Sequence, residues 1–166
     1  MNVTLVKDMM TDVVETLGIG DSLEQARQRM RAGRIRHLPV VDGQEKLVGL
    51  VTHRNILGAW LSHGCPEWEN PRRIADEVPV EMLMERDVLT VSPDTTAAMA
   101  TRLMEGNKFG CLPVVERGKL VGIVTEADFV RFARRYFDEE EAAAAASAQH
   151  DDRKEMTWPA VSHGAP

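Results

Sequence analysis

Two stretches of the chain carry a polar pair at the same spacing of three residues. The stretch "GKLVGIVTEADFV" places Thr125 before Asp128, and "EKLVGLVTHRNIL" places Thr52 before Asn55. Each pair falls where a strand should end and a helix begin, so both side chains are expected beside a helix N-terminus, whose N–H groups attract anions. A carboxylate accepts charge-assisted hydrogen bonds about twice as strong as neutral ones, whereas an amide presents both a donor and an acceptor. The alternative for either residue is a helix cap, and for Asn55 we favour the cap.

The remaining reactive side chains form no comparable group. Of the histidines and cysteines, only His63 and Cys65 stand close in sequence, and their spacing matches no common zinc signature. Cys111 heads an apolar strand, where burial is expected rather than reactivity. The "GKL" at Gly118 lacks the glycine-rich run that a phosphate-binding loop requires. The sequence therefore predicts no metal site, no catalytic residues and no enzymatic activity.

Composition limits the kinds of partner. The 166 residues carry a formal net charge of −6, which disfavours nucleic acid and anionic membranes because no broad cationic surface attracts phosphates. No apolar run approaches a membrane span, and the N-terminus lacks the apolar core of a signal peptide. The two cysteines lie in dissimilar settings and give no disulfide framework. We therefore expect a cytoplasmic protein without nucleic-acid or membrane partners.

An internal duplication organises the chain. Met10 falls on Met84 at a shift of 84 − 10 = 74 residues, and at the same shift "HLPVVD" falls on "CLPVVE". One residue is lost in the next turn, after which "KLVGLVT" lies over "KLVGIVT". Such a repeat indicates one supersecondary unit present twice, and roughly fifty residues form too small a core to be stable alone. The two halves should therefore pack together.

Each half is predicted to contain the same β-α-β-β-α order of elements. Helical spacing of apolar residues predicts an amphipathic helix, capped by Ser22 in the first half and by Thr95 in the second. Gly33 and Asn107 are expected to take the left-handed conformation that ends these helices. The predicted strands are residues 13–17, 37–41 and 46–51, then 88–91, 111–115 and 119–124. The predicted helices are residues 22–32 and 53–61, then 95–105 and 126 to about 136.

The predicted fold class is α/β (α+β), with two β-α-β-β-α repeats packed with pseudo-two-fold symmetry. Tight turns at Gly43 and Gly118 are expected to join the paired strands. A connector should hold a short helix at residues 72–77, and the last helix should extend to about Ala148 before a loose tail. The predicted division is repeat 1 at 1–62, connector at 63–79, repeat 2 at 80–137 and an acidic, alanine-rich extension at 138–166.

The duplicated motifs resemble those of the CBS domain pair, also called the Bateman module. The resemblance covers about residues 4–136 and rests on three features: the paired "LPVV" strands, the glycine–apolar–apolar–threonine turns at 49–52 and 122–125, and "TVSPDTT". It implies a non-catalytic regulatory module that binds AMP, ADP, ATP or S-adenosylmethionine in clefts between the repeats. It also implies a flat, disk-shaped homodimer whose output passes to an effector protein that remains unknown. The alternative is a dimerising interaction module that binds no nucleotide.

The resemblance also implies roles for individual residues. The family's T-x-x-D positions, here Thr125 and Asp128, contact the ribose. The phosphates would be met from the opposite repeat by Arg36, His37 and Arg54, and a solvated surface partnering nearby acids is the alternative for the arginines. Adenine requires an apolar slot with backbone edges, for which the candidates are Ile123, Pro39, Thr16 and Leu17.

A second, weaker site is implied on the first repeat. It would be built on Thr52 and Asn55, with Leu50 and Thr90 as further candidates. The opposite repeat would supply no cation to it, because the facing positions are Gly110, Cys111 and Ala127. The sequence therefore predicts one main nucleotide site per chain.

Overall fold

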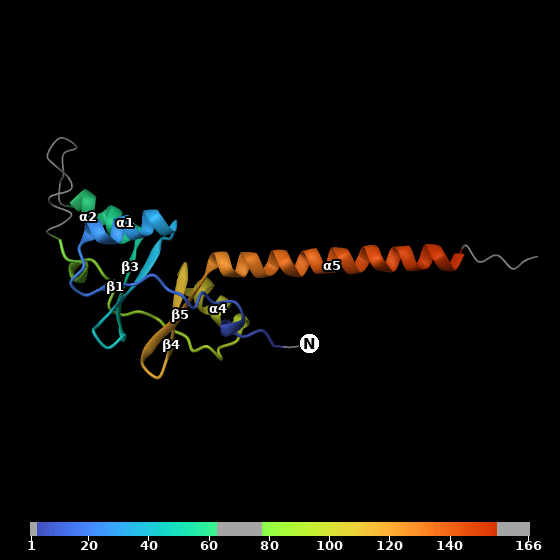
Figure 1. Cartoon of the computed structure of the whole chain (residues 1–166), viewed down its shortest axis with the longest axis horizontal. Helices are drawn as coiled ribbons and strands as arrows, with labels where there is room; N and C mark the ends of the chain where they lie inside the picture. The colour runs from blue at the N-terminus through green and yellow to red at the C-terminus, as the bar shows by residue number, and fades with distance from the viewer. Residues whose placement is uncertain (1–2, 63–77, 156–166) are drawn as a thin grey trace, which may run out of the picture. The chain divides into compact units, whose positions relative to one another are not determined.

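The computed structural model of the chain describes residues 3–62 and 78–155. Residues 1–128 form one compact unit, which contains the paired strands of both halves, and residues 129–166 form a second. Figure 1 shows the elements in chain order. The first half contains η1 (Val6–Asp8), β1 (Leu17–Gly18), α1 (Leu23–Gly33), β2 (His37–Val41), β3 (Leu47–Thr52) and α2 (His53–Ser62). The second half contains η2 (Val80–Met82), α4 (Ala97–Asn107), β4 (Cys111–Glu116), β5 (Lys119–Thr125) and α5 (Glu126–Glu155).

The strands form one three-stranded sheet and one two-stranded sheet. In the first, β2 pairs parallel with β1 and antiparallel with β3. In the second, β4 pairs antiparallel with β5, and a single parallel bridge from Val91 to Val114 stands where the first repeat has β1. The four paired strands predicted from the sequence are confirmed to within about a residue at each end.

The first strand of each half is much shorter than predicted. Of the predicted residues 13–17, only Leu17 pairs with β2, and Gly18 extends this pairing by one residue. Of the predicted residues 88–91, only Val91 pairs with β4. One position earlier along each parallel register, the partner strand presents Pro39 or Pro113, which has no N–H to donate to a ladder. The predicted strands at 13–17 and 88–91 are therefore wrong in extent.

The helix caps agree with prediction in one repeat and shift by a residue in the other. The Ser22 hydroxyl accepts the Gln25 N–H at 3.3 Å, and the Gln25 side chain accepts the Ser22 N–H at 2.7 Å, which confirms the predicted capping box. Thr96, rather than the predicted Thr95, caps α4. The Thr95 carbonyl instead accepts the Val6 N–H at 2.8 Å, a contact between distant segments that local sequence does not reveal.

The left-handed residues lie one position beyond those predicted. Arg34 (φ 51°) and Lys108 (φ 57°) take this conformation, while Gly33 and Asn107 are the last helical residues. In both repeats the N–H of the following residue donates to the carbonyl five positions earlier at 3.0 Å. This bond stabilises the left-handed turn at a residue that is not glycine.

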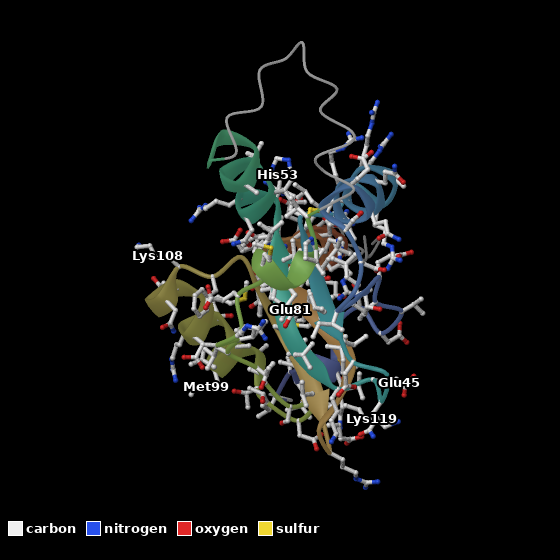
Figure 2. All side chains as sticks on the ribbon, turned by 90° about the vertical axis from the view of Figure 1, so that its left-hand side faces the viewer. Glu45, His53, Glu81, Met99, Lys108 and Lys119 are labelled. Atoms are coloured by element: carbon white, nitrogen blue, oxygen red, sulfur yellow. The ribbon has the colours of Figure 1, made fainter. Side chains whose placement is uncertain are left out.

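The two hairpins have different turns. Arg117 (φ 50°) and Gly118 (φ 82°) form a two-residue turn of the type that matches strand twist, as predicted for Gly118. The first hairpin is longer, and its left-handed residue is Glu45 (φ 63°) rather than Gly43. The Glu45 carboxylate accepts from the Lys119 ammonium at 2.9 Å, so the tips of the two hairpins meet across the repeats (Figure 2).

Residues 4–11, at the start of the first half, pack on the second half. Thr11 and Ile123 exchange two backbone hydrogen bonds of 2.9 Å, and the Ala97 N–H donates to the Thr4 carbonyl at 2.9 Å. Val6, in the same segment, has no exposed surface. Residues 4–11 therefore complete the core of the repeat to which they are not joined in sequence.

Residues 78–85, around the start of the second half, pack on the first half in the same way. Glu85 and Leu50 exchange two backbone hydrogen bonds of 2.9 Å, and the Leu23 N–H donates to the Val78 carbonyl at 2.8 Å. Val80 has no exposed surface and belongs to the core of the first repeat. Thr11 and Glu85 differ by 85 − 11 = 74 residues, so the exchange follows the internal duplication and confirms that the two halves pack together.

A glycine allows each of these segments to approach. A Cβ on Gly49 would lie 2.5 Å from the Met84 sulfur and 3.1 Å from the Glu85 carbonyl oxygen. A Cβ on Gly122 would lie 2.6 Å from the Met10 sulfur and 3.1 Å from a backbone oxygen of the same segment. Gly49 in β3 and Gly122 in β5 therefore leave the room that each segment needs for its close approach.

The last helix is longer than predicted. It runs without interruption to Glu155, so residues after Ala148 that were expected to form a loose tail are helical. The predicted connector helix at 72–77 lies outside the described residues, and the division into repeats, connector and extension remains a prediction. Among the described residues, no helix combines the length and the apolar character needed to cross a bilayer.

Candidate ligand-binding site

The two polar pairs occupy equivalent places in the two repeats. Thr125 ends β5 opposite Cys111, and Thr52 ends β3 opposite His37. A helix begins at the next residue in each case. The repeats therefore present each pair where a strand turns into a helix, as the sequence predicted.

Asp128 caps the start of α5 from within the helix. It is 3% exposed, and its Oδ2 accepts both the Thr125 N–H and the Thr125 hydroxyl at 2.7 Å. Because α5 begins at Glu126, Asp128 is the third helical residue, and Thr125 precedes the helix. Asp128 thus holds the position of the acidic partner in a capping box, not that of the N-cap residue weighed from the sequence.

Asn55 makes the same local bonds with a different side chain. Its Oδ1 accepts the Thr52 N–H at 2.8 Å and the Thr52 hydroxyl at 2.6 Å, and its own N–H donates to the Thr52 hydroxyl at 3.2 Å. A backbone N–H can only donate, so the amide oxygen must face Thr52 and the amide nitrogen must face away.

The two repeats therefore share a capping geometry and differ in one atom. Where Asp128 carries Oδ1, an acceptor on a charged group, Asn55 carries Nδ2, a donor on a neutral group. A helix-capping function explains what the two residues have in common. It does not require a carboxylate in one half, because the amide serves equally in the other.

Two of the predicted phosphate contacts are exposed arginines. The Arg36 carbonyl accepts the His53 N–H at 2.9 Å, so the residue before β2 lies beside the first residue of α2, and Arg54 is the second residue of that helix. Both arginines are exposed. Within residues 3–62 and 78–155, neither guanidinium forms an ion pair, so no acidic partner of the kind weighed from the sequence is seen there.

His37 reaches the second repeat. A Cβ on Gly110 would lie 3.1 Å from His37 Nε2 and 3.8 Å from a carboxylate oxygen of Glu126, so the glycine admits the imidazole between the repeats. Burial and the neighbouring Arg36 lower the pKa of His37, and Glu126 raises it in part. The contact brings a predicted phosphate residue close to the start of α5.

Glu126 was missed by the sequence reasoning. Its N–H donates to the Gly110 carbonyl at 3.2 Å, and its carboxylate lies near His37. The available signal was its place directly after Thr125, inside the T-x-x-D motif. It adds a negative charge beside the proposed phosphate residues.

The predicted adenine contacts are mostly core residues. Leu17 and Pro39 are fully buried, Ile123 is 7% exposed, and both backbone polar groups of Ile123 bond to Thr11. Thr16 is half-buried, and its carbonyl accepts from the Arg29 guanidinium. The Ile123 backbone groups and the Thr16 carbonyl are therefore already bonded within the chain.

The residues predicted for the second site differ in exposure. Leu50 is half-buried and bonds to Glu85 through its backbone, whereas Thr90 is exposed. Cys111, predicted to face this site, is 4% exposed, and burial raises the pKa of its thiol to about 12. The thiol is therefore a core group without thiolate character at neutral pH, as expected from its strand.

No group of three His, Cys, Asp or Glu side chains in the described part of the chain is placed to hold a metal ion. His63 and Cys65 lie outside the described residues.

Comparison with solved structures places the chain among CBS proteins. The AcuB protein from Vibrio cholerae is 36% identical, with 85% of this chain and 98% of that chain covered and a TM-score of 0.73. The CBS domain pair of protein MJ0100, in complex with 5-methylthioadenosine and S-adenosyl-L-methionine, is 28% identical over 81% and 99% of the two chains, with a TM-score of 0.71. CBSX2 in complex with AMP is 30% identical over 80% and 98%, with a TM-score of 0.68.

The chain spans about a quarter of the length of the homoserine O-acetyltransferases that it matches. The chain is 36% identical over 129 residues to the homoserine O-acetyltransferase of Methanococcoides burtonii, which corresponds to 77% of this chain and 24% of that enzyme. The CBS domain model matches twice, at residues 6–62 and 80–135, which are the two halves of the internal duplication. The chain therefore belongs to the CBS domain family, as a tandem CBS domain pair.

Proposed function

We propose that this CBS pair binds one adenine nucleotide, AMP, ADP or ATP, per chain at the site built on Thr125 and Asp128, and acts as a non-catalytic regulatory module. The observation that carries the proposal is the atom that distinguishes the repeats. Asp128 offers a charged acceptor where Asn55 offers a neutral donor. A ribose cis-diol donates two hydroxyl hydrogens, for which a carboxylate is the stronger acceptor.

Cations on the first repeat support the phosphate end of the proposal. Arg36 and Arg54 are exposed and form no ion pair with the described residues, so a phosphate would not have to displace an acid from them. His37 already touches the second repeat at Gly110. A nucleotide held by Asp128 and these residues would bond to both repeats at once.

Such a ligand can regulate because it touches both repeats. It shifts an equilibrium between arrangements only by its differential affinity for them. In the proposal, the homodimer of CBS pairs transmits that shift to an effector protein.

S-adenosylmethionine is the second candidate ligand. The specific observation that favours it is Glu126, whose carboxylate lies beside His37 and would attract a cationic ligand group. The MJ0100 pair was solved with this ligand, and CBSX2 with AMP.

Calorimetric titration of the full chain with AMP, ATP, adenosine and S-adenosylmethionine tests the proposal. Arg54→Ala should weaken AMP binding about tenfold, because one charge-assisted contact to phosphate is lost, and should leave adenosine binding almost unchanged. Arg102→Ala removes an exposed arginine from α4 and serves as the matched control.

The titration separates the alternatives. Equal loss of AMP and adenosine binding in Arg54→Ala would show that Arg54 does not face phosphate. Binding of S-adenosylmethionine alone would assign the site to that ligand. If none of the four ligands binds at millimolar concentration, the proposed nucleotide function is wrong. The interaction module that binds no nucleotide is then the remaining alternative.

A further inference from the structure

The second unit of the chain carries an exposed stripe along α5. Five residues, spaced by four, three, four and three positions, lie on one side of the helix, because this spacing averages 3.5 residues per turn. They are Val130, Arg134, Phe137, Glu141 and Ala144, named below as the stripe. Figure 1 shows α5 as one uninterrupted helix.

The stripe is solvent-exposed throughout. Val130 is 68% exposed and Phe137 58%, and the side chain of Arg134 is 70% exposed. Every side chain from Arg134 to Ala146 is exposed. Two large apolar side chains on such a helix expose surface that pairing would remove from water.

The stripe is complementary to a second copy of itself that runs in the opposite direction. Read from either end, an apolar residue comes first, then a charge, then Phe137 in the middle. The two charges have opposite signs, Arg134 on one side of Phe137 and Glu141 on the other. Reversing the stripe therefore sets cation against anion and the larger Val130 against the smaller Ala144.

We propose that α5 pairs antiparallel with α5 of a second copy of this chain, along the stripe, with the two Phe137 rings at the crossing. In this register Arg134 of each copy lies opposite Glu141 of the other, because 134 + 141 = 275 and 2 × 137 = 274 differ by one residue, about 1.5 Å. Val130 lies opposite Ala144, since 130 + 144 = 274. The contact is isologous and closes as a dimer.

Charge selects both the orientation and the occupant. Parallel pairing would set Arg134 against Arg134 and Glu141 against Glu141, which is repulsive. A different protein would need its own complementary stripe, whereas a second copy supplies one. The charges, the side-chain sizes and the aromatic ring all match when two stripes are paired antiparallel about Phe137. This match favours pairing with a second copy of the chain.

The contacts within one copy do not prevent this pairing. Arg134 donates to Asp138 at 3.1 Å, but both side chains are more than half exposed, and such pairs contribute only about 0–1 kcal/mol. Within one copy, Phe137 packs edge-on against the neighbouring Tyr136, with ring centroids 5.9 Å apart. Arg134 can therefore contact both Asp138 and the second copy.

The pairing makes a small interface. About four helical turns on each copy would bury less than a standard protein interface, so the association should be weak, salt-sensitive and seen at micromolar concentration or above. It does not depend on the proposed nucleotide site, and a failure of either proposal leaves the other untouched.

Sedimentation equilibrium of the full chain at low salt tests the proposal with charge reversals. Arg134→Glu gives a stripe with two acids, and Glu141→Arg gives one with two cations. Each variant alone should lose at least about tenfold in the association step, because two like-charge contacts replace two ion pairs. An equimolar mixture of the two variants should regain that step as a mixed dimer.

The mixture excludes an effect within one helix, since a second chain cannot restore a lost Arg134–Asp138 bond. Arg135→Glu and Glu139→Arg change the same charges off the stripe and are the matched controls. Association that is absent in the wild type, unchanged in both stripe variants, or not regained on mixing would overturn the proposal. Loss of equal size in the off-stripe controls would also overturn it.

Discussion

At the scale of single residues, the two repeats differ at one position that both caps a helix and belongs to the proposed ligand site, Asn55 in the first repeat and Asp128 in the second. Asp128 and Asn55 both satisfy the threonine that precedes a helix, with bonds of 2.6 to 2.8 Å. The helix therefore begins in the same way in each repeat. What differs is the second polar atom of each side chain, a carboxylate oxygen in Asp128 and an amide nitrogen in Asn55.

His37 gives a residue-level prediction about pH. Its folded-state pKa lies below the ordinary value of 6.5, because burial and Arg36 disfavour the imidazolium more than Glu126 favours it. The unfolded chain therefore binds more protons as pH falls below about 6.5, and the contribution to stability is present above that pH and lost as pH falls through the folded pKa. The thermal midpoint of the wild type should therefore decrease when the pH is lowered from 7.5 to 5.5.

His37→Gln should show a smaller fall over the same range, measured by thermal denaturation. His53→Gln replaces an exposed histidine of α2 and is the matched control. If the His37 variant keeps the full slope, another group dominates the titration.

At the scale of elements, the close approach of two segments depends on glycine. Gly122→Ala should destabilise the chain by about 1–3 kcal/mol, because the new methyl group meets both the Met10 sulfur and a backbone oxygen, and the backbone cannot yield as a side-chain end can. Urea denaturation measures the change. Amide exchange at Thr11 and Ile123 should quicken, since their two hydrogen bonds join the displaced segment to β5.

Gly106→Ala is the matched control in α4. Nothing lies within 4 Å of its added methyl group, so the change should be neutral or should stabilise by roughly 0.5–1 kcal/mol through helix propensity. Equal destabilisation by both substitutions would contradict the account of the close approach at Gly122.

Elements with periodic patterns could be predicted from the sequence, and their ends could not. The helices of residues 23–33 and 97–107 follow apolar spacing, and the four long strands follow "LPVV" and its partner. Thr96 caps α4 instead of Thr95 because the Thr95 carbonyl is bonded to Val6, which lies 95 − 6 = 89 residues away in the chain. Such a bond has no local signal.

At the scale of the whole molecule, the duplication predicted that the halves pack together but not how. The exchange of residues 4–11 and 78–85 between repeats was not predicted, because short segments with one or two buried side chains carry no periodicity. Gly49 and Gly122 belong to repeated sequence motifs, but the physical reason for glycine there depends on the opposing Met84 and Met10, which the sequence alone does not place.

The candidate site was predictable to a similar degree. The T-x-x-D pair and the cross-repeat position of His37 follow from the motif and the resemblance. The neighbouring Glu126 and the use of both Ile123 backbone groups by Thr11 depend on tertiary contacts. The grouping of Arg36, Arg54 and Asp128 around one ligand stays a prediction.

The two halves share one fold, and we propose that they are unequal as ligand sites. Asp128→Asn gives the second repeat the residue that the first repeat has at this position. The new amide oxygen can accept the same two bonds from Thr125 that Asn55 accepts from Thr52, so the helix cap is kept. The ribose loses its charged acceptor and meets a donor instead.

Calorimetric titration of AMP into the wild type and into Asp128→Asn is the most direct measurement, with thermal denaturation of both chains without ligand. The account predicts one AMP per wild-type chain, affinity at least about tenfold weaker in the variant, and matching thermal midpoints. Two equal sites per chain, or a variant that binds AMP as tightly as the wild type, would contradict it.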